Sequence, residues 1–358
     1  MLSSTDSKAL EPVAHGGLLD GELAGLGVTP DDVLDVSVNV NPYGPSSDMI
    51  DAIRGAPIHR YPDPTSTEAR RVLACTLDVD MQDVVLGNGA VDLLWTIVRS
   101  FLDRASAAVI VEPTFSEFRG AVVAVGARAV GWCAAEETRF AISLEEVARV
   151  VVRERAKLVY LCAPGNPTGV PVPIDDVAIF ARDLCGTIVV LDQAFLSMST
   201  RFRDIERRMP PNVACVRSIT KDHAIPGVRV GYLLASRAIS ARVEASRPPW
   251  TASAFAQAAM IMATREGAFI AESRTRWLED RARLAHRVPL PCIESSAPYV
   301  LARVGDATAF RRRLLERHRV LVRDCTSFGL RDHVRLCARP LADEDRLLAA
   351  LKEELPRC

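Results

Sequence analysis

Apolar residues between about residues 46 and 245 fall into short runs separated by stretches with helical spacing. The runs are Val84–Leu86, Ala107–Val111, Leu158–Cys162, Ile188–Leu191 and Val213–Val216. Their apolar positions are continuous rather than alternating, which is typical of strands buried on both faces of a largely parallel sheet. This part of the chain is therefore predicted to form an α/β domain.

The pattern changes near Pro248, where long helical patterns begin and run to about Arg287. Beyond them, helices expected at 307–318 and 341–355 are interleaved with the apolar runs Tyr299–Ala302, Val320–Val322 and His333–Cys337. By contrast, the first 45 residues are polar and rich in glycine and proline, which favours irregular backbone. The predicted organisation is an N-terminal arm (1–45), a large α/β domain (46–245), and a linking helix with a small C-terminal α+β domain (246–358).

Composition favours a globular enzyme. The 358 residues are 49% hydrophobic and 25% charged, and a formal net charge of −1 gives no field that would recruit nucleic acid or an anionic membrane. No apolar run reaches the roughly 18 residues of a membrane span, and the N-terminus lacks a signal-peptide pattern. The nine scattered cysteines indicate reduced thiols in a cytoplasmic protein. Without a Cys-x-x-Cys or His-x-x-x-His pair, no metal site is expected.

Polar segments follow several of the predicted strands, and ligands bind at this edge of open α/β sheets. Gly87-Asn88-Gly89-Ala90 precedes a helical stretch from Val91, so its backbone N–H groups are suited to a phosphate, although a tight turn has the same composition. Asp192 directly follows a strand, and Asn166 lies in a Pro/Gly-rich loop. Taken singly, these two are equally compatible with a helix cap and a turn.

Lys221 stands out because arginine supplies almost all the positive charge. The chain has four lysines: Lys8, Lys157, Lys221 and Lys352. Lys221 alone lies in a turn-rich segment flanked by hydroxyl groups, with Arg229 eight residues further on. A primary amine can form an imine with an aldehyde, whereas guanidinium stays protonated and is no nucleophile. Lys221 is therefore a candidate for covalent catalysis.

The order of these segments resembles a known family. The motifs are Gly87-Asn88-Gly89, Pro113-Thr114-Phe115, Asn166-Pro167-Thr168-Gly169, Asp192-x-Ala194-Phe195, and Ser218-x-Thr220-Lys221 with Arg229 and Gly231. Together they are similar to the pattern of pyridoxal-phosphate enzymes of fold type I, the aspartate aminotransferase fold, from about residue 35 to the end. The resemblance implies a mostly parallel central sheet flanked by helices, with a small domain formed by the C-terminal region and the N-terminal arm.

The resemblance also implies roles around pyridoxal 5'-phosphate. Lys221 would hold the cofactor as a Schiff base and carry protons, and Asp192 would pair with the ring nitrogen. Asn166 would hydrogen-bond the ring oxygen, and Phe115 would stack on the ring. The phosphate would be bound by Gly89, Ala90, Val91, Ser218 and Arg229. Tyr61 resembles a tyrosine that reaches this phosphate from a neighbouring subunit, which implies a homodimer.

Two branches of this fold compete, histidinol-phosphate aminotransferase and threonine-phosphate decarboxylase. The segments Ala14–Gly17, Asp35–Pro42 and Arg335–Arg339 look more like the decarboxylase. Arg335 matches the arginine that clamps the substrate carboxylate. The other residues expected to bind substrate are His15, Asn41, Arg339 and His223, of which His15 and Arg339 would suit a phosphate or phosphonate. Taken alone, His15 is equally compatible with a partly buried arm residue and Arg339 with a surface charge.

Some residues depart from the family pattern. Gln193 stands where both branches usually have glutamate, and Asp222-His223 replaces an aromatic pair expected in the decarboxylase. Val91 lacks a hydroxyl common in the phosphate site. His223 is suited to acid–base chemistry near neutral pH, but the same pair is also compatible with supporting the loop. These differences favour a paralogue with an altered substrate, in specialised metabolism.

The leading hypothesis is a decarboxylase of a phosphorylated or otherwise anionic amino acid. Its alternative is a class I/II aminotransferase that resembles histidinol-phosphate aminotransferase. A non-enzymatic pyridoxal-phosphate sensor is a third hypothesis, weakened because such regulators carry a DNA-binding domain for which this sequence leaves no room.

Overall fold

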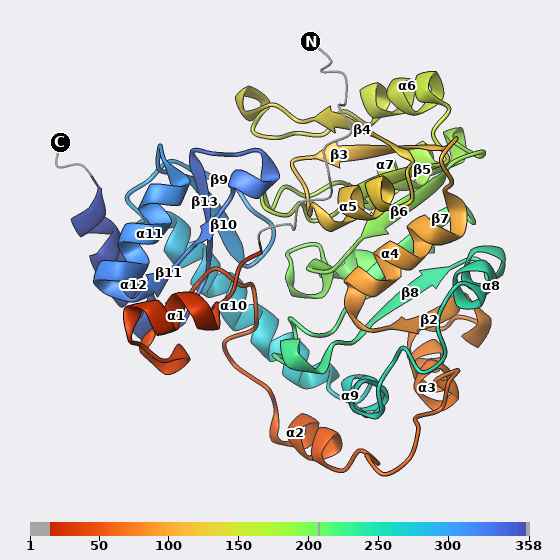
Figure 1. The fold of residues 1–358 in the computed structure, drawn as a ribbon, viewed down its shortest axis with the longest axis horizontal. Helices are drawn as coiled ribbons and strands as arrows, with labels where there is room; N and C mark the ends of the chain where they lie inside the picture. The colour runs from red at the N-terminus through yellow and green to blue at the C-terminus, as the bar shows by residue number, and fades with distance from the viewer. Residues whose placement is uncertain (1–14, 207, 356–358) are drawn as a thin grey trace.

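The computed structural model describes residues 15–206 and 208–355 (Figure 1). Its centre is a seven-stranded sheet in the order β2-β8-β7-β6-β5-β3-β4. The strands are β2 Val84–Gly87, β3 Ala107–Glu112, β4 Arg128–Cys133, β5 Leu158–Cys162, β6 Ile188–Asp192, β7 Val213–Ser218 and β8 Gly231–Ala235. All neighbours pair in parallel except β8, which is antiparallel to both β2 and β7. The mostly parallel sheet predicted from the apolar runs is confirmed.

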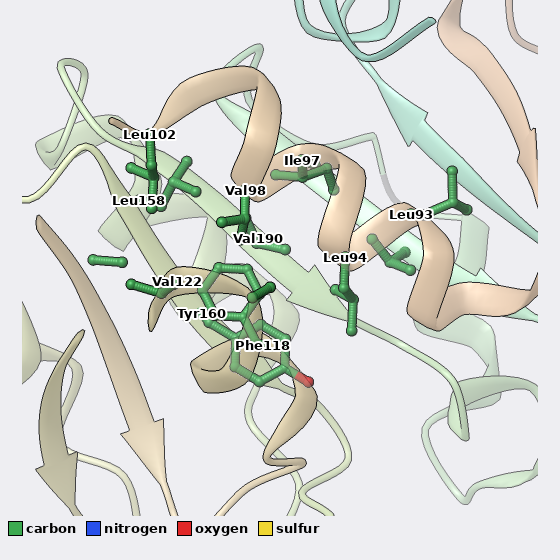
Figure 2. Packing of buried hydrophobic residues seen from close by; sticks show 14 of the residues in the cluster. Leu93, Leu94, Ile97, Val98, Leu102, Phe118, Val122, Leu158, Tyr160 and Val190 are labelled. Carbon is green, nitrogen blue, oxygen red and sulfur yellow. The ribbon is translucent and has the colours of Figure 1, made fainter. Parts of the chain in front are cut away.

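Helices cover both faces of this sheet. The helices around it are α2 Ser47–Arg54, α3 Thr67–Leu77, α4 Gly89–Phe101, α5 Glu117–Ala124, α6 Leu144–Glu154, α7 Ile174–Asp183, α8 Arg237–Ala245 and α9 Ala254–Ala263. Within β5, Leu158 and Tyr160 pack with α4 and α5, whereas Val159 and Leu161 pack with α6 and α7. Figure 2 shows the first of these clusters, in which α4 lies over β5 and β6. Burial on both faces explains why the strands are apolar at every position.

A second sheet belongs to the C-terminal part of the chain. Its strands are β9 Cys292–Ile293, β10 Tyr299–Arg303, β12 Arg323–Asp324 and β13 His333–Cys337, all antiparallel, in the order β12-β13-β10-β9. The long helix α10 Gly267–Arg287 packs on it with α11 Ala307–His318 and α12 Leu341–Glu354. The helix and strand elements expected here are present, and the division into domains stays a prediction.

The N-terminal segment is more ordered than its composition predicted. The described part contains α1 Asp20–Leu26 and the strand β1 Leu34–Asp35, which pairs in parallel with β11 Val320–Leu321. Leu23 of α1 is buried against Leu315 and Leu321, and α1 ends at Gly27 in a left-handed conformation that caps its last carbonyls. Tertiary packing thus orders a segment whose local sequence favours loops. No helix among the described residues combines the length and apolar character needed to cross a membrane.

Candidate active site

A cavity of about 370 Å³ lies at the carboxyl ends of the parallel strands. Lys221, Asp192, Asn166, Phe115 and Ser218 line it together, although they come from four separate segments. Asp192 ends β6 and Ser218 ends β7, so the sheet itself places them at one edge. The structure therefore brings together most of the residues that sequence analysis singled out.

Lys221 follows β7 in a turn, with its Nζ 5.3 Å from the centre of the Phe195 ring. Burial lowers the pKa of the Lys221 ammonium, and the Arg229 and Arg335 guanidinium groups lower it further, whereas Asp192 and Asp222 oppose the change. A lowered pKa increases the share of neutral amine, which is the nucleophilic form. The surroundings of Lys221 thus favour attack on a carbonyl group.

Asp192 is buried, with 4% of its surface exposed. The Tyr160 hydroxyl donates to its Oδ2 over 2.7 Å, and the Ala194 backbone N–H donates to its Oδ1 over 3.0 Å. Burial raises the pKa of Asp192, while these two hydrogen bonds and the Lys221 charge partly offset the rise. The carboxylate is therefore fixed in orientation and has a high affinity for a proton or a cationic N–H.

The N-terminus of α4 forms one end of the cavity. Gly89 has φ +80°, and a Cβ built on it would lie 2.6 Å from Nη2 of Arg229. Ala90 and Val91 line the cavity beside Arg229, and the Ser218 and Thr220 hydroxyl oxygens lie 2.8 Å apart on its wall. Free backbone N–H groups, a guanidinium and hydroxyl groups together make a site for a phosphate-sized anion.

Arg335 belongs to β13, and its buried side chain lies beside Asn166. Its Nη1 donates to Oδ1 of Asn166, and its Nη2 donates to the Ser37 carbonyl over 2.6 Å. The guanidinium carbon is 5.3 Å from the centre of the Tyr299 ring. These contacts hold the guanidinium in one orientation next to the loop that carries Asn166.

Arg323 was not anticipated from the sequence. It is the direct cross-strand neighbour of Arg335 in the β12–β13 pair, so both side chains leave the same face of the sheet. Burial and the Arg335 charge lower the pKa of Arg323 to about 10. The Arg323 guanidinium also donates from Nη2 to the Ser327 hydroxyl over 2.7 Å.

His15 lines the cavity with its ring centre 5.8 Å from that of Phe115. Its Nε2 lies 2.7 Å from Oε1 of Glu117, and the Trp95 indole donates to Oε2 of Glu117 over 2.8 Å. Glu117 also lines the cavity and was missed, because a carboxylate at the start of a helix ordinarily indicates only favourable charge near the helix dipole.

Three of the residues expected to bind substrate make other contacts in the structure, and their substrate roles stay predictions. Arg339 donates from Nη2 to the Asp35 carbonyl and from Nη1 to the Val40 carbonyl over 3.5 Å. The Asn41 amide donates to the Asp222 carbonyl over 2.7 Å, and its Oδ1 accepts from the Tyr43 backbone N–H. None of Arg339, Asn41 and His223 is among the residues that line the cavity.

The His223 ring instead lies between two carboxylates, with Nδ1 3.0 Å from Asp222 Oδ1 and Nε2 3.5 Å from Glu266 Oε2. This placement matches the alternative in which Asp222 and His223 support the loop.

Tyr61 also lies outside the cavity, on the surface. Its side chain is 79% exposed and stacks on Trp250 at a ring distance of 4.8 Å. Ile58 and Phe255 are exposed as well. The position of Tyr61 is therefore incompatible with contact to the same chain's cavity and compatible with contact to a second chain.

The chain matches the family described as aminotransferase class I and II over residues 31–352. Histidinol-phosphate aminotransferase from Halorubrum lacusprofundi is 31% identical over 339 residues, covering 92% of this chain and 91% of that protein. Threonine-phosphate decarboxylase from Salmonella typhimurium is 30% identical over 367 residues, covering 97% and 98%.

Among solved structures, histidinol-phosphate aminotransferase from Sinorhizobium meliloti, in complex with pyridoxal-5'-phosphate, superimposes with a TM-score of 0.82 at 27% identity over 92% of each chain. The family match spans nearly the whole chain, and the fold and the order of the site segments agree with it. The chain belongs to the aminotransferase class I and II family.

Proposed function

We propose that this protein is a pyridoxal-phosphate enzyme that decarboxylates an amino acid carrying a phosphate or another second anionic group. One observation carries the proposal: Lys221, Asp192 and the anion site at the N-terminus of α4 face a single cavity. An amine, a buried acid and a phosphate site are the three contacts that this cofactor needs. The relative from Sinorhizobium meliloti, which has the same fold, was crystallised with pyridoxal-5'-phosphate.

The residues present fit the cofactor. The absence of a side chain at Gly89, where a Cβ would collide with Arg229, leaves the α4 N-terminus open to a phosphate. When bound, the cofactor supplies a ring that accepts electrons from the substrate's α-carbon. Lys221 would bind its aldehyde carbon and later move protons at the substrate, while Asp192 would hold the proton on the ring nitrogen. Asn166 and Phe115 would orient the ring.

We propose the two buried arginines as the substrate anchors; neither is among the residues that line the cavity, and Arg335 adjoins it through Asn166. Arg335, held by Asn166 and Ser37, would bind the α-carboxylate through a two-pronged hydrogen bond. Arg323 beside it and His15 at the cavity mouth provide further positive or donor groups for a second anionic group. A substrate with two anionic groups would relieve the repulsion between the buried guanidinium groups.

The bond that breaks is the one held perpendicular to the cofactor ring, so the anchors decide the reaction. Decarboxylation is supported by the N-terminal His15 segment, which resembles that of the decarboxylase and reaches the cavity, and by the full-length similarity to the Salmonella typhimurium enzyme. Transamination is the second candidate, supported by the similarity to the aminotransferase from Halorubrum lacusprofundi.

A homodimer completes the proposed site. Tyr61 would contact the cofactor phosphate of a second subunit, since its own cavity is out of reach. The exposed aromatic surface around Tyr61 and Trp250 supports this contact. In this proposal the active form is a cytoplasmic homodimer.

Product analysis separates the candidates. The cofactor-loaded protein should be incubated with amino acids and their phosphate esters, and the products identified by mass spectrometry. Decarboxylation predicts carbon dioxide and an amine without any keto-acid acceptor. Transamination predicts a keto product and dependence on an acceptor such as 2-oxoglutarate. If the cofactor-loaded protein absorbs visible light but converts no anionic amino acid by either reaction, both decarboxylation and transamination are contradicted.

A further inference from the structure

A buried ionic cluster begins at Asp222, directly after Lys221 in the chain, and none of its members is among the residues that line the cavity. It consists of Asp222, His223 and Glu266, which are 4%, 4% and 8% exposed. His223 lies between the two acids, 3.0 Å from Asp222 Oδ1 and 3.5 Å from Glu266 Oε2. Two buried carboxylates without a counterion would be costly in free energy, and a protonated imidazole ring between them lowers that cost. The negative charges of Asp222 and Glu266 raise the pKa of His223 against the effect of burial, which alone would lower it.

The cluster is held from several elements at once. The Ser197 hydroxyl, in the 3₁₀ turn that follows β6, donates to Asp222 Oδ2 over 2.8 Å. The Ser46 hydroxyl, which caps α2, donates to Glu266 at the start of α10. The Asn41 amide donates to the Asp222 carbonyl, and the Asn41 backbone N–H donates to the Lys221 carbonyl over 2.8 Å. In Figure 1, α10 runs from α9 to the small sheet, so the cluster joins both parts of the fold at the lysine.

The cluster also acts on Lys221 electrostatically. The charged groups that influence the Lys221 nitrogen are Asp192, Asp222, Arg229 and Arg335. Of these, only Asp222 has a titratable histidine bonded to it. When His223 carries a proton, it offsets the Asp222 charge. When His223 loses the proton, the full negative charge of Asp222 acts on the neighbouring nitrogen.

We propose that His223 is a positioning residue that, through the Asp222 carboxylate, controls how readily the Lys221 nitrogen holds its proton. Asp222 and Glu266 both favour the protonated form of His223, and the hydrogen bonds from Ser197 and Ser46 fix the two carboxylates. This inference rests on the proposed function, because the nitrogen it acts on is the one proposed to bind the cofactor. It gives a role to the Asp222-His223 pair, which departs from the family pattern.

Two substitutions should change the proton affinity in opposite directions. His223→Gln leaves the Asp222 charge without a counterion, so the pH-dependent transition in the visible absorbance of the cofactor-loaded protein should move to higher pH. Asp222→Asn removes the negative charge, so the transition should move to lower pH. We expect each shift to be roughly half a unit or more. Glu266→Gln removes a charge that favours protonated His223, so it should give a smaller shift in the same direction as His223→Gln, and it provides a further variant if one of the others does not fold.

His333→Gln is the matched control. His333 is also buried and lies between two carboxylates, Asp332 and Glu136, but in the small sheet. The His333→Gln substitution should leave the pH-dependent transition in the visible absorbance unchanged. A purely structural role for His223 would shift the transitions of His223→Gln and Asp222→Asn in the same direction or in neither, and that result would overturn the inference.

A second measurement needs no cofactor. Because the pKa of His223 is raised in the folded protein, its stabilising contribution is present below its unfolded pKa and is lost as pH rises through the folded value. Thermal unfolding of the apoprotein should therefore show a decline on the alkaline side that His223→Gln lacks, and an identical decline in the variant would count against the cluster. If wild type shows this decline but never a visible band with the cofactor, the proposed function fails while the cluster stands.

Discussion

The phenol of Tyr160 donates to Oδ2 of Asp192 over 2.7 Å, and its ring stacks on Phe118 at 4.4 Å. Tyr160 is itself fully buried, so it cannot turn away from the carboxylate. The Asp192 carboxylate, which lines the cavity, is thus held by Tyr160, a side chain of the hydrophobic core (Figure 2).

Asp192→Asn should impair catalysis without impairing folding. Asparagine can accept from the Ala194 N–H and donate to the Tyr160 oxygen, so the local hydrogen bonds survive. It cannot hold a proton on a ring nitrogen, and we expect kcat to fall about 100-fold or more. Since burial raises the pKa of Asp192, its ionisation costs folding free energy as pH rises above the ordinary carboxyl range. The variant apoprotein should therefore unfold at the same or a higher temperature at neutral pH, and unchanged turnover would contradict the assigned role.

Lys221→Ala should abolish turnover and the visible absorbance of the bound cofactor, because no other lysine among the described residues lines the cavity. The control is Lys157→Ala, which removes an exposed lysine whose partner is Asp103. Absorbance spectra and product assays of both variants check the prediction. Turnover at the wild-type rate in Lys221→Ala would refute the covalent role.

Gly89→Ala should weaken cofactor binding. The added methyl group would lie 2.6 Å from Arg229 Nη2, and φ +80° is unfavourable for alanine by about 1–2 kcal/mol. We expect the cofactor dissociation constant to rise about tenfold or more, measured by absorbance or fluorescence titration. Gly227→Ala is the matched control, because its added Cβ meets nothing within 4 Å. Equal dissociation constants for the two variants would contradict an anion site at the α4 N-terminus.

Arg335→Lys and Arg323→Lys should weaken substrate binding more than cofactor binding. Lysine keeps the charge but loses the planar pair of donors, and we expect KM to rise about 10- to 100-fold for an anionic amino acid. Arg303→Lys, an exposed arginine of the same sheet paired with Asp332, serves as the control. Steady-state kinetics give the comparison. A KM unchanged in both buried-site variants would exclude these residues as anchors.

Tyr61 can be tested by subunit mixing. Tyr61→Ala and Lys221→Ala should each have low activity, but a mixed dimer contains one site with both residues intact. Random pairing should therefore restore about a quarter of the wild-type activity. No recovery, with dimers present by analytical ultracentrifugation, would show that Tyr61 does not act across the interface.

Much of the fold follows from sequence periodicity. The helix at 307–318 and the strand His333–Cys337 were predicted with the ends that the structure shows. The edge strand β4 was missed, since its residues are mostly part-buried and give no continuous apolar run. Helix α1 was missed because its stability comes from residues about 290 positions away rather than from its own sequence.

Site residues could be predicted from the sequence only where they belong to a short, recognisable motif. Lys221, Asp192 and Asn166 follow strands in a recognisable order, and they meet in the cavity. Tyr160 looks like any residue of an apolar strand, and Arg323 has no local signal at all. The roles proposed for Tyr160 and Arg323 depend on contacts across strands, which a single sequence does not show. Arg339 illustrates the converse: the sequence shows a charge that resembles a ligand anchor, whereas its hydrogen bonds to two backbone carbonyls appear only in the structure.

The pairing of β1 with β11 has a consequence during synthesis. Leu34 and Asp35 bond to a strand that begins at Val320, so this segment must wait during synthesis for a strand that is made much later. Asn41, which bonds to the Lys221 turn, follows directly from this segment. Nascent chains stalled before residue 320 should therefore contain a formed central sheet but an incompletely enclosed lysine, so full cofactor capture is expected only after Val320 and Leu321 have been synthesised and paired.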